Sequence, residues 1–246
     1  MTNTQEIITH YWDLRAHVYH SYHIDSERAH ADRRAWKNIF RRFIPSTAQR
    51  VLDVGTGDGY VAHLLADLGL NVVGIDTSSG MLAEARAEES ARRQRNLPSA
   101  SFRQGDATAL PPDLSNFDVV TSRFLMWTLR TPVHSVESWT RVLRPGGRII
   151  AADANWFTQG IPQTTKVQSA EGPDAFIRAY SGSVISDLPL ATADSPERYA
   201  DIFREVGLKD VSVTSLPEIT ALDEKYGTAP GHESKPHFIV CGSTPV

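Results

Sequence analysis

The chain has 246 residues, 41% of them hydrophobic, and 25 Lys and Arg against 29 Asp and Glu give a formal net charge of −4. This is the composition of a globular protein, and it offers no basic surface for nucleic acid. A single cysteine excludes an intramolecular disulfide and a cysteine-rich zinc site, and without a signal peptide or an 18-residue apolar run we expect a cytoplasmic protein with no membrane partner.

Two helices are predicted in the first 45 residues. The first opens with Asn3 and Glu6 in the spacing of a capping box, and its apolar residues recur at intervals of three and four. The second runs from about Ser26 to Phe43, where Pro45 stops it. Neither helix can form a domain alone, so we expect residues 1–45 to cover the domain that follows.

From Arg50 onward, short β-rich runs alternate with helical patterns. One helix closes at Gly69, and another begins at Thr131 and Pro132. Alternation of this kind predicts a parallel sheet with right-handed crossovers and helices on both faces. The strands of this region are predicted at residues 51–54, 72–75, 101–104, 118–122 and 148–153.

The C-terminal part begins with about 40 residues that lack a clear strand pattern. A capped helix then starts at Ser195 and ends at Gly207. The runs Val211–Val213 and Phe238–Cys241 are typical of a terminal antiparallel pair. The predicted fold class is therefore α/β, with a seven-stranded mixed sheet that is parallel except for one reversed strand near the C-terminus.

A glycine-rich turn follows the first predicted strand, in the segment Val-Leu-Asp-Val-Gly-Thr-Gly-Asp-Gly at residues 51–59. Glycines permit a tight turn and close approach of a ligand, and the first helical N–H groups offer hydrogen-bond donors. The spacing differs from the dinucleotide fingerprint, because Tyr60 occupies the place of its third glycine. Asp76 ends the second strand, where its carboxylate can accept both ribose hydroxyls, and Asp106 after the third strand can accept from an adenine amino group.

Together these residues resemble the class I S-adenosylmethionine (SAM)-dependent methyltransferase superfamily over most of residues 5–155. The resemblance implies a Rossmann-like fold, SAM as the cofactor and no metal. It extends to the motifs Val-Gly-Ile-Asp at 73–76, Gly-Asp-Ala at 105–107, Asn-Phe-Asp-Val-Val at 116–120 and Leu-Arg-Pro-Gly-Gly-Arg at 143–148.

The resemblance also implies where the cofactor is bound. The ribose is expected at Asp76 and the adjacent Thr77, and the adenine beside Met81. The remaining implied contacts are Gly105, Asp106 and Ala107 at the adenine amino group, and Gly55, Thr56 and Gly57 under the methionine part.

A narrower resemblance, to small-molecule methyltransferases with an N-terminal Tyr-Trp-Asp helix, lies in residues 11–19, 122–127 and 153–156. Tyr11, Arg15 and Tyr19 share one helix face, which can close over the cofactor. An aromatic ring would attract the sulfonium, and Arg15 would pair with the methionine carboxylate. The alternative is that these residues only pack the helix against the sheet.

Other candidate residues follow the fourth and fifth strands, at the edge where ligands bind in open α/β sheets. Arg123 contacts ligand or forms a salt bridge that holds the N-terminal helices. Asn155, which can orient the cofactor amine or an acceptor, joins Tyr180 and Tyr19 as the expected catalytic residues. Five histidines in the first 30 residues lack a recognisable metal-ligand set, so we expect a polar cluster or exposed side chains there.

The expected organisation is a single SAM-binding domain, residues 1–246. Within it we expect a helical lid (1–45), a cofactor-binding core (46–153), a substrate-pocket insertion (154–194) and a C-terminal helix and strand pair (195–246).

The functional prediction is methyl transfer from SAM to a small-molecule acceptor. One alternative is a SAM cyclase, similar to the azetidine-2-carboxylate synthases, in which the α-amino group of SAM displaces methylthioadenosine. Others are a non-catalytic SAM-binding protein, since one fold hosts many functions, and an NAD oxidoreductase. The acceptor, the alkylated atom and the oligomeric state are left open.

Overall fold

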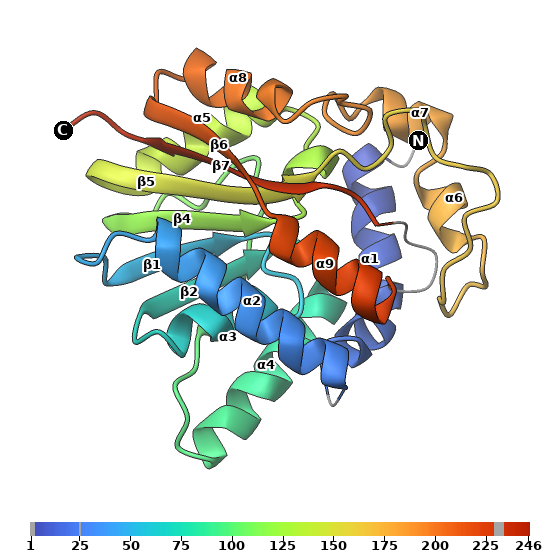
Figure 1. The fold of residues 1–246 in the computed structure, drawn as a ribbon, viewed down its shortest axis with the longest axis horizontal. Coiled ribbons are helices and arrows are strands. Elements are labelled where there is room, and N and C mark those ends of the chain that lie inside the picture. The colour runs from blue at the N-terminus through green and yellow to red at the C-terminus, as the bar shows by residue number, and fades with distance from the viewer. Residues whose placement is uncertain (1–2, 25, 229–233) are drawn as a thin grey trace.

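The predicted alternation of strands and helices forms one seven-stranded sheet in the computed structural model, which describes residues 3–24, 26–228 and 234–246 (Figure 1). The strand order is β3-β2-β1-β4-β5-β7-β6, in which β1 to β5 are parallel and β7 runs antiparallel to both of its neighbours. The prediction of a single reversed strand is confirmed. The strands are β1 (Arg50–Val54), β2 (Asn71–Asp76), β3 (Ser101–Gln104), β4 (Phe117–Arg123), β5 (Leu143–Ala154), β6 (Lys209–Ser215) and β7 (His237–Ser243).

Helices cover both faces of the sheet, and α1 lies beyond the ends of the parallel strands (Figure 1). Asn3 and Glu6 form the predicted capping box at the start of α1. The helix α9 was not predicted, because its segment reads as the connection between the last two strands. No described helix has both the length and the apolar character needed to cross a bilayer. The helices are α1 (Thr4–Ser21), α2 (Glu27–Phe43), α3 (Tyr60–Ala66), α4 (Ser79–Gln94), α5 (Pro132–Val142), α6 (Ala175–Ala179), α7 (Gly182–Ser186), α8 (Glu197–Glu205) and α9 (Pro217–Tyr226), with a 3₁₀ turn, η1, at Met126–Thr128.

Two apolar cores lie on opposite faces of the sheet, because successive side chains of a strand point to opposite faces. In β5, Ile149 and Ala151 pack with α5 and α8, whereas Ile150 and Ala152 pack with α2, α3 and α9. Burial of each large apolar side chain contributes about 1.5–3 kcal/mol to stability. The two cores therefore hold the strand ends in a fixed arrangement.

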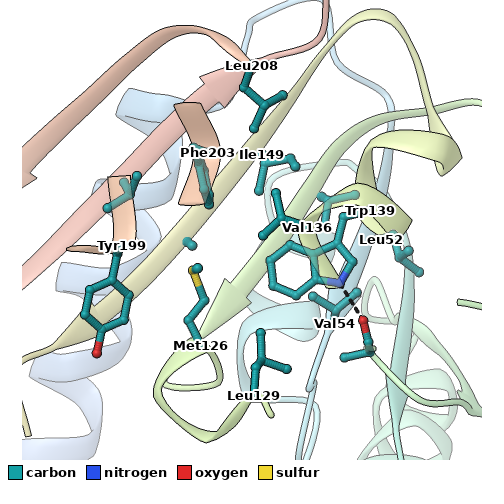
Figure 2. Close-up of a cluster of buried hydrophobic side chains, with 14 of the residues drawn as sticks. Leu52, Val54, Met126, Leu129, Val136, Trp139, Ile149, Tyr199, Phe203 and Leu208 are labelled. Carbon is teal, nitrogen blue, oxygen red and sulfur yellow. Dashed lines mark hydrogen bonds between the residues drawn. The ribbon is translucent and has the colours of Figure 1, made fainter. Parts of the chain in front are cut away.

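Trp139 links the first core to the loop that follows β3 (Figure 2). Its ring is fully buried beside Val136 and Phe203, and its Nε1 donates a hydrogen bond to the Ala107 carbonyl at 2.8 Å. A buried indole N–H needs such a partner. The contact fixes the backbone of the loop after β3, which is expected to bind adenine.

Arg92 is buried, although it lies in an arginine-rich stretch, residues 86–95, whose charges alone predict a solvated helix face. Only 5% of Arg92 is exposed, its guanidinium pairs with Asp67, and its Nε donates to the Pro98 carbonyl at 2.7 Å. The last turn of α4 packs on the connection between α3 and β2, so one arginine of the stretch is buried and paired.

Candidate functional site

A cavity lies at the carboxyl ends of the parallel strands. β1 is hydrogen-bonded to β2 on one side and to β4 on the other, so the chain leaves β1 and β4 in opposite directions. Ligands of open α/β sheets bind in the crevice that such a reversal creates. Its lining includes residues that follow β1 (Gly55, Gly57), β2 (Thr77), β3 (Gly105, Asp106) and β4 (Phe124, Leu125).

The loop after β1 depends on two glycines with left-handed backbone angles. Gly55 has φ +63°, and a Cβ there would lie 2.7 Å from Leu125 Cδ1. Gly57 has φ +56°, and a Cβ there would meet nothing within 4 Å. Gly55 therefore lets the loop after β4 approach, while Gly57 keeps the backbone open toward the cavity.

Asp76 is held in place by two backbone donors. The amide of Gly57 donates to its Oδ2 at 2.8 Å and that of Ser78 donates to its Oδ1 at 2.9 Å. Burial raises the pKa of Asp76, and these hydrogen bonds oppose that shift. Each carboxylate oxygen has a second lone pair, so the fixed carboxylate can still accept two ribose hydroxyls.

Asp106 lines the cavity next to Ala107, whose carbonyl Trp139 holds. The amide and the hydroxyl of Thr108 both donate to Asp106 Oδ1 at 2.8 Å. The other carboxylate oxygen of Asp106, Oδ2, accepts no hydrogen bond from the described part of the chain. This oxygen is therefore the one that can accept a hydrogen bond from a ligand amino group.

One face of α1 forms the outer wall of the cavity. Gln5, Ile8, Trp12, Arg15 and Tyr19 line it, and their spacing alternates between three and four residues. This is the spacing of a single helix face.

A different face of α1 is fixed to the start of α4. Asp13 Oδ1 accepts hydrogen bonds from the Gly80 amide at 2.8 Å and the Ser78 hydroxyl at 2.7 Å. Thr9 and Thr77 hydroxyls meet at 3.2 Å. The aspartate of the Tyr-Trp-Asp segment thus positions the helix over the cavity, a role that was not predicted.

The structure brings most of the predicted site residues together. The following predicted residues line the cavity: Arg15, Tyr19, Gly55, Gly57, Asp76, Thr77, Met81, Gly105, Asp106, Ala107 and Arg123.

Four predicted residues lie outside the lining, because partners within the protein hold them. The Thr56 hydroxyl donates to Asp53 at 2.7 Å, and the Asn155 amide donates to the Ala193 carbonyl at 2.9 Å. The remaining two are Tyr11, whose hydroxyl accepts from Arg15, and Tyr180, whose hydroxyl accepts from Trp12 Nε1 at 3.0 Å.

Six aromatic side chains in the cavity lining were not predicted. They are Trp12, Phe124, Trp127, Trp156, Phe157 and Phe176, and together they form an aromatic wall. Phe124 has φ +59°, a backbone conformation that is uncommon outside glycine and often found at functional sites. The motif at residues 122–127 and the spacing along α1 were the available signals. The unpredicted lining residues are Gln5, Ile8, Trp12, Thr108, Phe124, Leu125, Trp127, Thr128, Leu129, Trp156, Phe157 and Phe176.

Asp153 supports this wall from behind instead of lining the cavity. Its carboxylate accepts from Trp156 Nε1 at 2.6 Å and from the Trp127 amide at 3.3 Å. Burial raises the pKa of Asp153 to about 7, and hydrogen bonds from Ala154 and Trp156 oppose the shift. The side chain therefore orients two tryptophans of the wall.

Arg123 lies among aromatic rings. Its guanidinium carbon is 4.5 Å from the centroid of Tyr60 and 4.7 Å from that of Phe124. Its Nη2 is 3.5 Å from the Tyr19 hydroxyl and 3.4 Å from His23 Nε2. No described carboxylate forms an ion pair with Arg123, so the salt-bridge alternative is not what the structure shows.

Two of the N-terminal histidines form a polar cluster with Asp58. His20 Nδ1 and His23 Nδ1 lie 3.0 Å and 2.8 Å from Asp58 Oδ2. Burial alone would raise the pKa of Asp58, but the two histidines hold it well below its usual range. The hydrogen bond to Asp58 raises the pKa of His20. No metal-binding group of His, Cys, Asp and Glu exists within the described ranges.

Replacing His20 by glutamine is expected to reduce stability in a pH-dependent way. Because the pKa of His20 is higher in the folded state, its contribution is complete below about pH 6.5 and is lost as the pH rises through the folded value. We expect a loss of about 1 kcal/mol at pH 5 that shrinks by pH 8. Denaturant unfolding between pH 4.5 and 8.5 measures it, with His17→Gln, whose side chain is 89% exposed, as control. A loss that does not change with pH would contradict the role of the pair.

Comparison with known proteins places these features in context. The methyltransferase domain family matches residues 52–151. The chain is 30% identical to a demethylmenaquinone methyltransferase of Renibacterium salmoninarum over 196 residues, 74% of this chain and 76% of the relative. It is 32% identical to a malonyl-[acyl-carrier protein] O-methyltransferase of Enterobacter lignolyticus over 216 residues, 83% of this chain and 78% of the relative.

Solved structures show the same fold. A phosphoethanolamine N-methyltransferase 2 of Haemonchus contortus, in complex with phosphomonomethylethanolamine and S-adenosylhomocysteine, superimposes with a TM-score of 0.63 at 18% identity. The match covers 99% of this chain and 58% of that one.

Proposed function

Because the chain belongs to the class I SAM-dependent methyltransferases, we propose that it transfers the methyl group of SAM to a small organic acceptor, with SAM bound in the strand-end cavity. One observation carries the placement of SAM. The Asp76 carboxylate is held by two backbone N–H groups beside the open face of Gly57, with lone pairs left for a ribose. The similarity to a demethylmenaquinone methyltransferase supports a small organic acceptor.

The proposed cofactor position follows the lining of the cavity. The ribose binds Asp76, and the adenine lies near Met81 with its amino group at Asp106 Oδ2. The methionine part crosses the open backbone at Gly57 toward α1, where the Arg15 guanidinium can pair with its carboxylate.

Methyl transfer from a sulfonium is an in-line displacement. The bond from the acceptor atom to the methyl carbon forms as the carbon–sulfur bond breaks, and S-adenosylhomocysteine leaves. The protein therefore needs to align the reactants and exclude water. The aromatic wall can do both, and rings such as Trp12 attract the positive sulfonium.

In the proposed enzyme, α1 and residues 154–194 form different walls of the cavity. The helix α1 acts as a lid, because five residues of one face line the cavity while Asp13 anchors another face. The segment of residues 154–194 contributes Trp156, Phe157 and Phe176 to the wall, which supports its role in shaping the acceptor pocket.

For the cyclase alternative, Asn155 is not available as the residue that orients the amine of SAM. Asn155 does not line the cavity, and its amide is bonded to the Ala193 carbonyl. Cyclisation of SAM nevertheless uses the same cofactor site, so its product must be measured directly.

The test is mass spectrometry of the purified protein with SAM alone and with a panel of small acceptors. We expect S-adenosylhomocysteine only with an acceptor, and methylthioadenosine at the level of a control without enzyme. Catalytic methylthioadenosine with a product of the mass of azetidine-2-carboxylate would identify a cyclase instead. Tight SAM binding without turnover of any acceptor would identify a binding protein.

A further inference from the structure

Three rings of the aromatic wall lie next to one another in the strand-end cavity, and we call them the ring sector. They belong to Trp127, Phe157 and Phe176. The ring centroid of Phe157 is 5.3 Å from that of Trp127, edge to face, and 5.7 Å from that of Phe176, in a tilted arrangement. Aromatic rings prefer such offset and edge-to-face contacts, which a further flat ring can extend.

The ring sector lies on the side of the cavity away from the proposed adenine. Trp127 follows β4 and Phe157 follows β5, whereas Asp76 and Asp106 follow β2 and β3. Because the strand order is β3-β2-β1-β4-β5, the glycine loop after β1 lies between these two sides. An acceptor bound at the ring sector is therefore adjacent to the methionine part of SAM in the proposed complex.

Polar atoms around the ring sector are already bonded within the protein. Trp156 Nε1 donates to Asp153 at 2.6 Å, Trp12 Nε1 donates to the Tyr180 hydroxyl at 3.0 Å, and the Thr128 hydroxyl donates to a backbone carbonyl at 2.8 Å. A charged ligand group placed here would lose its hydration without gaining a partner. The surroundings of the ring sector therefore favour an uncharged ligand.

The two arginines of the cavity lie against other rings of the wall. The guanidinium carbon of Arg15 is 5.9 Å from the centroid of Trp12, and that of Arg123 is 4.7 Å from the centroid of Phe124. Arg15 is the proposed partner of the SAM carboxylate. Both cations thus belong to the part of the wall formed by α1 and the first residues after β4.

We propose that the methyl acceptor carries a flat, uncharged aromatic ring, and that this ring packs against Trp127, Phe157 and Phe176. The inference rests on the proposed methyl transfer and names the class of its acceptor. Recognition is by ring shape and apolar surface, and the nucleophilic group of the acceptor extends from the ring toward the glycine loop after β1.

Asp153 is a positioning residue for this acceptor. Its Oδ1 accepts from the Ala154 amide at 2.9 Å as well as from Trp156 Nε1, and its Oδ2 accepts from the Trp127 amide at 3.3 Å. One buried carboxylate therefore joins the turn after β4 to the turn after β5. Asn155 holds the second turn from its other side through the Ala193 carbonyl, so both residues act on the acceptor through the ring sector.

The first test compares three ligands of matched size by calorimetry, with the protein saturated with S-adenosylhomocysteine. They are 2-naphthol, its saturated counterpart decahydro-2-naphthol, and the charged 6-hydroxy-2-naphthoate. We expect 2-naphthol to bind at least fivefold more tightly than either of the others. Equal or tighter binding of the saturated alcohol or of the carboxylate overturns the proposal, as does the absence of 2-naphthol binding.

Replacing Phe157 with leucine removes a ring but keeps an apolar side chain. We expect Phe157→Leu to weaken 2-naphthol binding at least threefold, while the affinities for decahydro-2-naphthol and S-adenosylhomocysteine stay within twofold. Phe43→Leu is the matched control, because Phe43 packs in the core on one face of the sheet and does not line the cavity. Equal losses for 2-naphthol and its saturated counterpart would show that Phe157 contributes packing alone, and would overturn the proposal.

Asp153→Asn tests the positioning role, because an amide has one acceptor oxygen and cannot accept from both Trp156 Nε1 and the Trp127 amide. We expect weaker 2-naphthol binding, a shifted tryptophan fluorescence maximum, and S-adenosylhomocysteine affinity within twofold. Asp174→Asn, an exposed carboxylate paired with Lys166, is the control. Unchanged 2-naphthol binding and fluorescence, or an equal loss of both ligands, overturns the role of Asp153. Failure of the unsubstituted protein to bind S-adenosylhomocysteine would instead refute the proposed function.

Discussion

Replacing Asp76 with alanine is expected to weaken SAM binding by about 5- to 150-fold, a loss on the order of 1–3 kcal/mol. The substitution removes the acceptor of both ribose hydroxyls in the proposed complex. It also leaves the amides of Gly57 and Ser78 without the oxygens that hold the loops after β1 and β2. Titration calorimetry with SAM measures the change.

The control for this prediction is Asp113→Ala, which removes an exposed carboxylate that pairs with Arg103. Asp76→Asn keeps one oxygen for a backbone amide and should give an intermediate affinity. The melting temperature of each variant distinguishes lost binding from lost folding. Wild-type SAM affinity in Asp76→Ala would refute the placement of the ribose.

Replacing Gly80 with alanine is expected to displace α1 from the cavity and to lower SAM affinity by about 10- to 100-fold. A Cβ at this position would lie 2.6 Å from the Asp13 carbonyl oxygen and 2.9 Å from its Cα. These are backbone atoms, which cannot rotate away as a side chain could, so one helix must move. Overpacking of this kind costs about 1–3 kcal/mol, and the movement would weaken the bonds from Asp13 to Gly80 and Ser78.

Two measurements follow α1 directly. Calorimetry gives the SAM affinity, and limited proteolysis reports the exposure of residues 4–21. Gly182→Ala is the matched control, because a Cβ there meets nothing within 4 Å. If Gly80→Ala binds SAM and resists proteolysis as the control does, α1 does not act as a lid.

The glycine-rich loop after β1 is in contact with the end of α1. Asp58 follows directly on the glycines of the cofactor loop, and its contacts with His20 and His23 reach back to the end of α1. The same loop therefore lines the proposed cofactor site through Gly57 and holds the end of α1 through Asp58. A change at the end of α1 is expected to affect cofactor binding.

The sequence by itself determined the succession of strands and helices along the chain except for α9, the reversed strand and the position of the glycine-rich loop after β1. These features follow from local patterns: alternation of two in strands, near 3.6 in helices, and glycines where the backbone needs positive φ. Asp76 and Asp106 could be found because each directly follows a strand, and parallel strands end at one edge. The face of α1 that lines the cavity was predicted only in part, because Arg15 and Tyr19 belong to it but Tyr11 does not.

The tertiary structure alone decided which side chains face the ligand sites. Nothing local in the chain indicates that Asn155 bonds to Ala193, that Arg92 is buried, or that Arg28 meets Asp223 across 195 residues of sequence. A second cavity beside the first is likewise lined by residues of the turn after α1, of α9 and of β7. Such contacts depend on how the two helical layers pack on the sheet, and a periodicity that repeats every two to four residues carries no information about partners so distant in the chain.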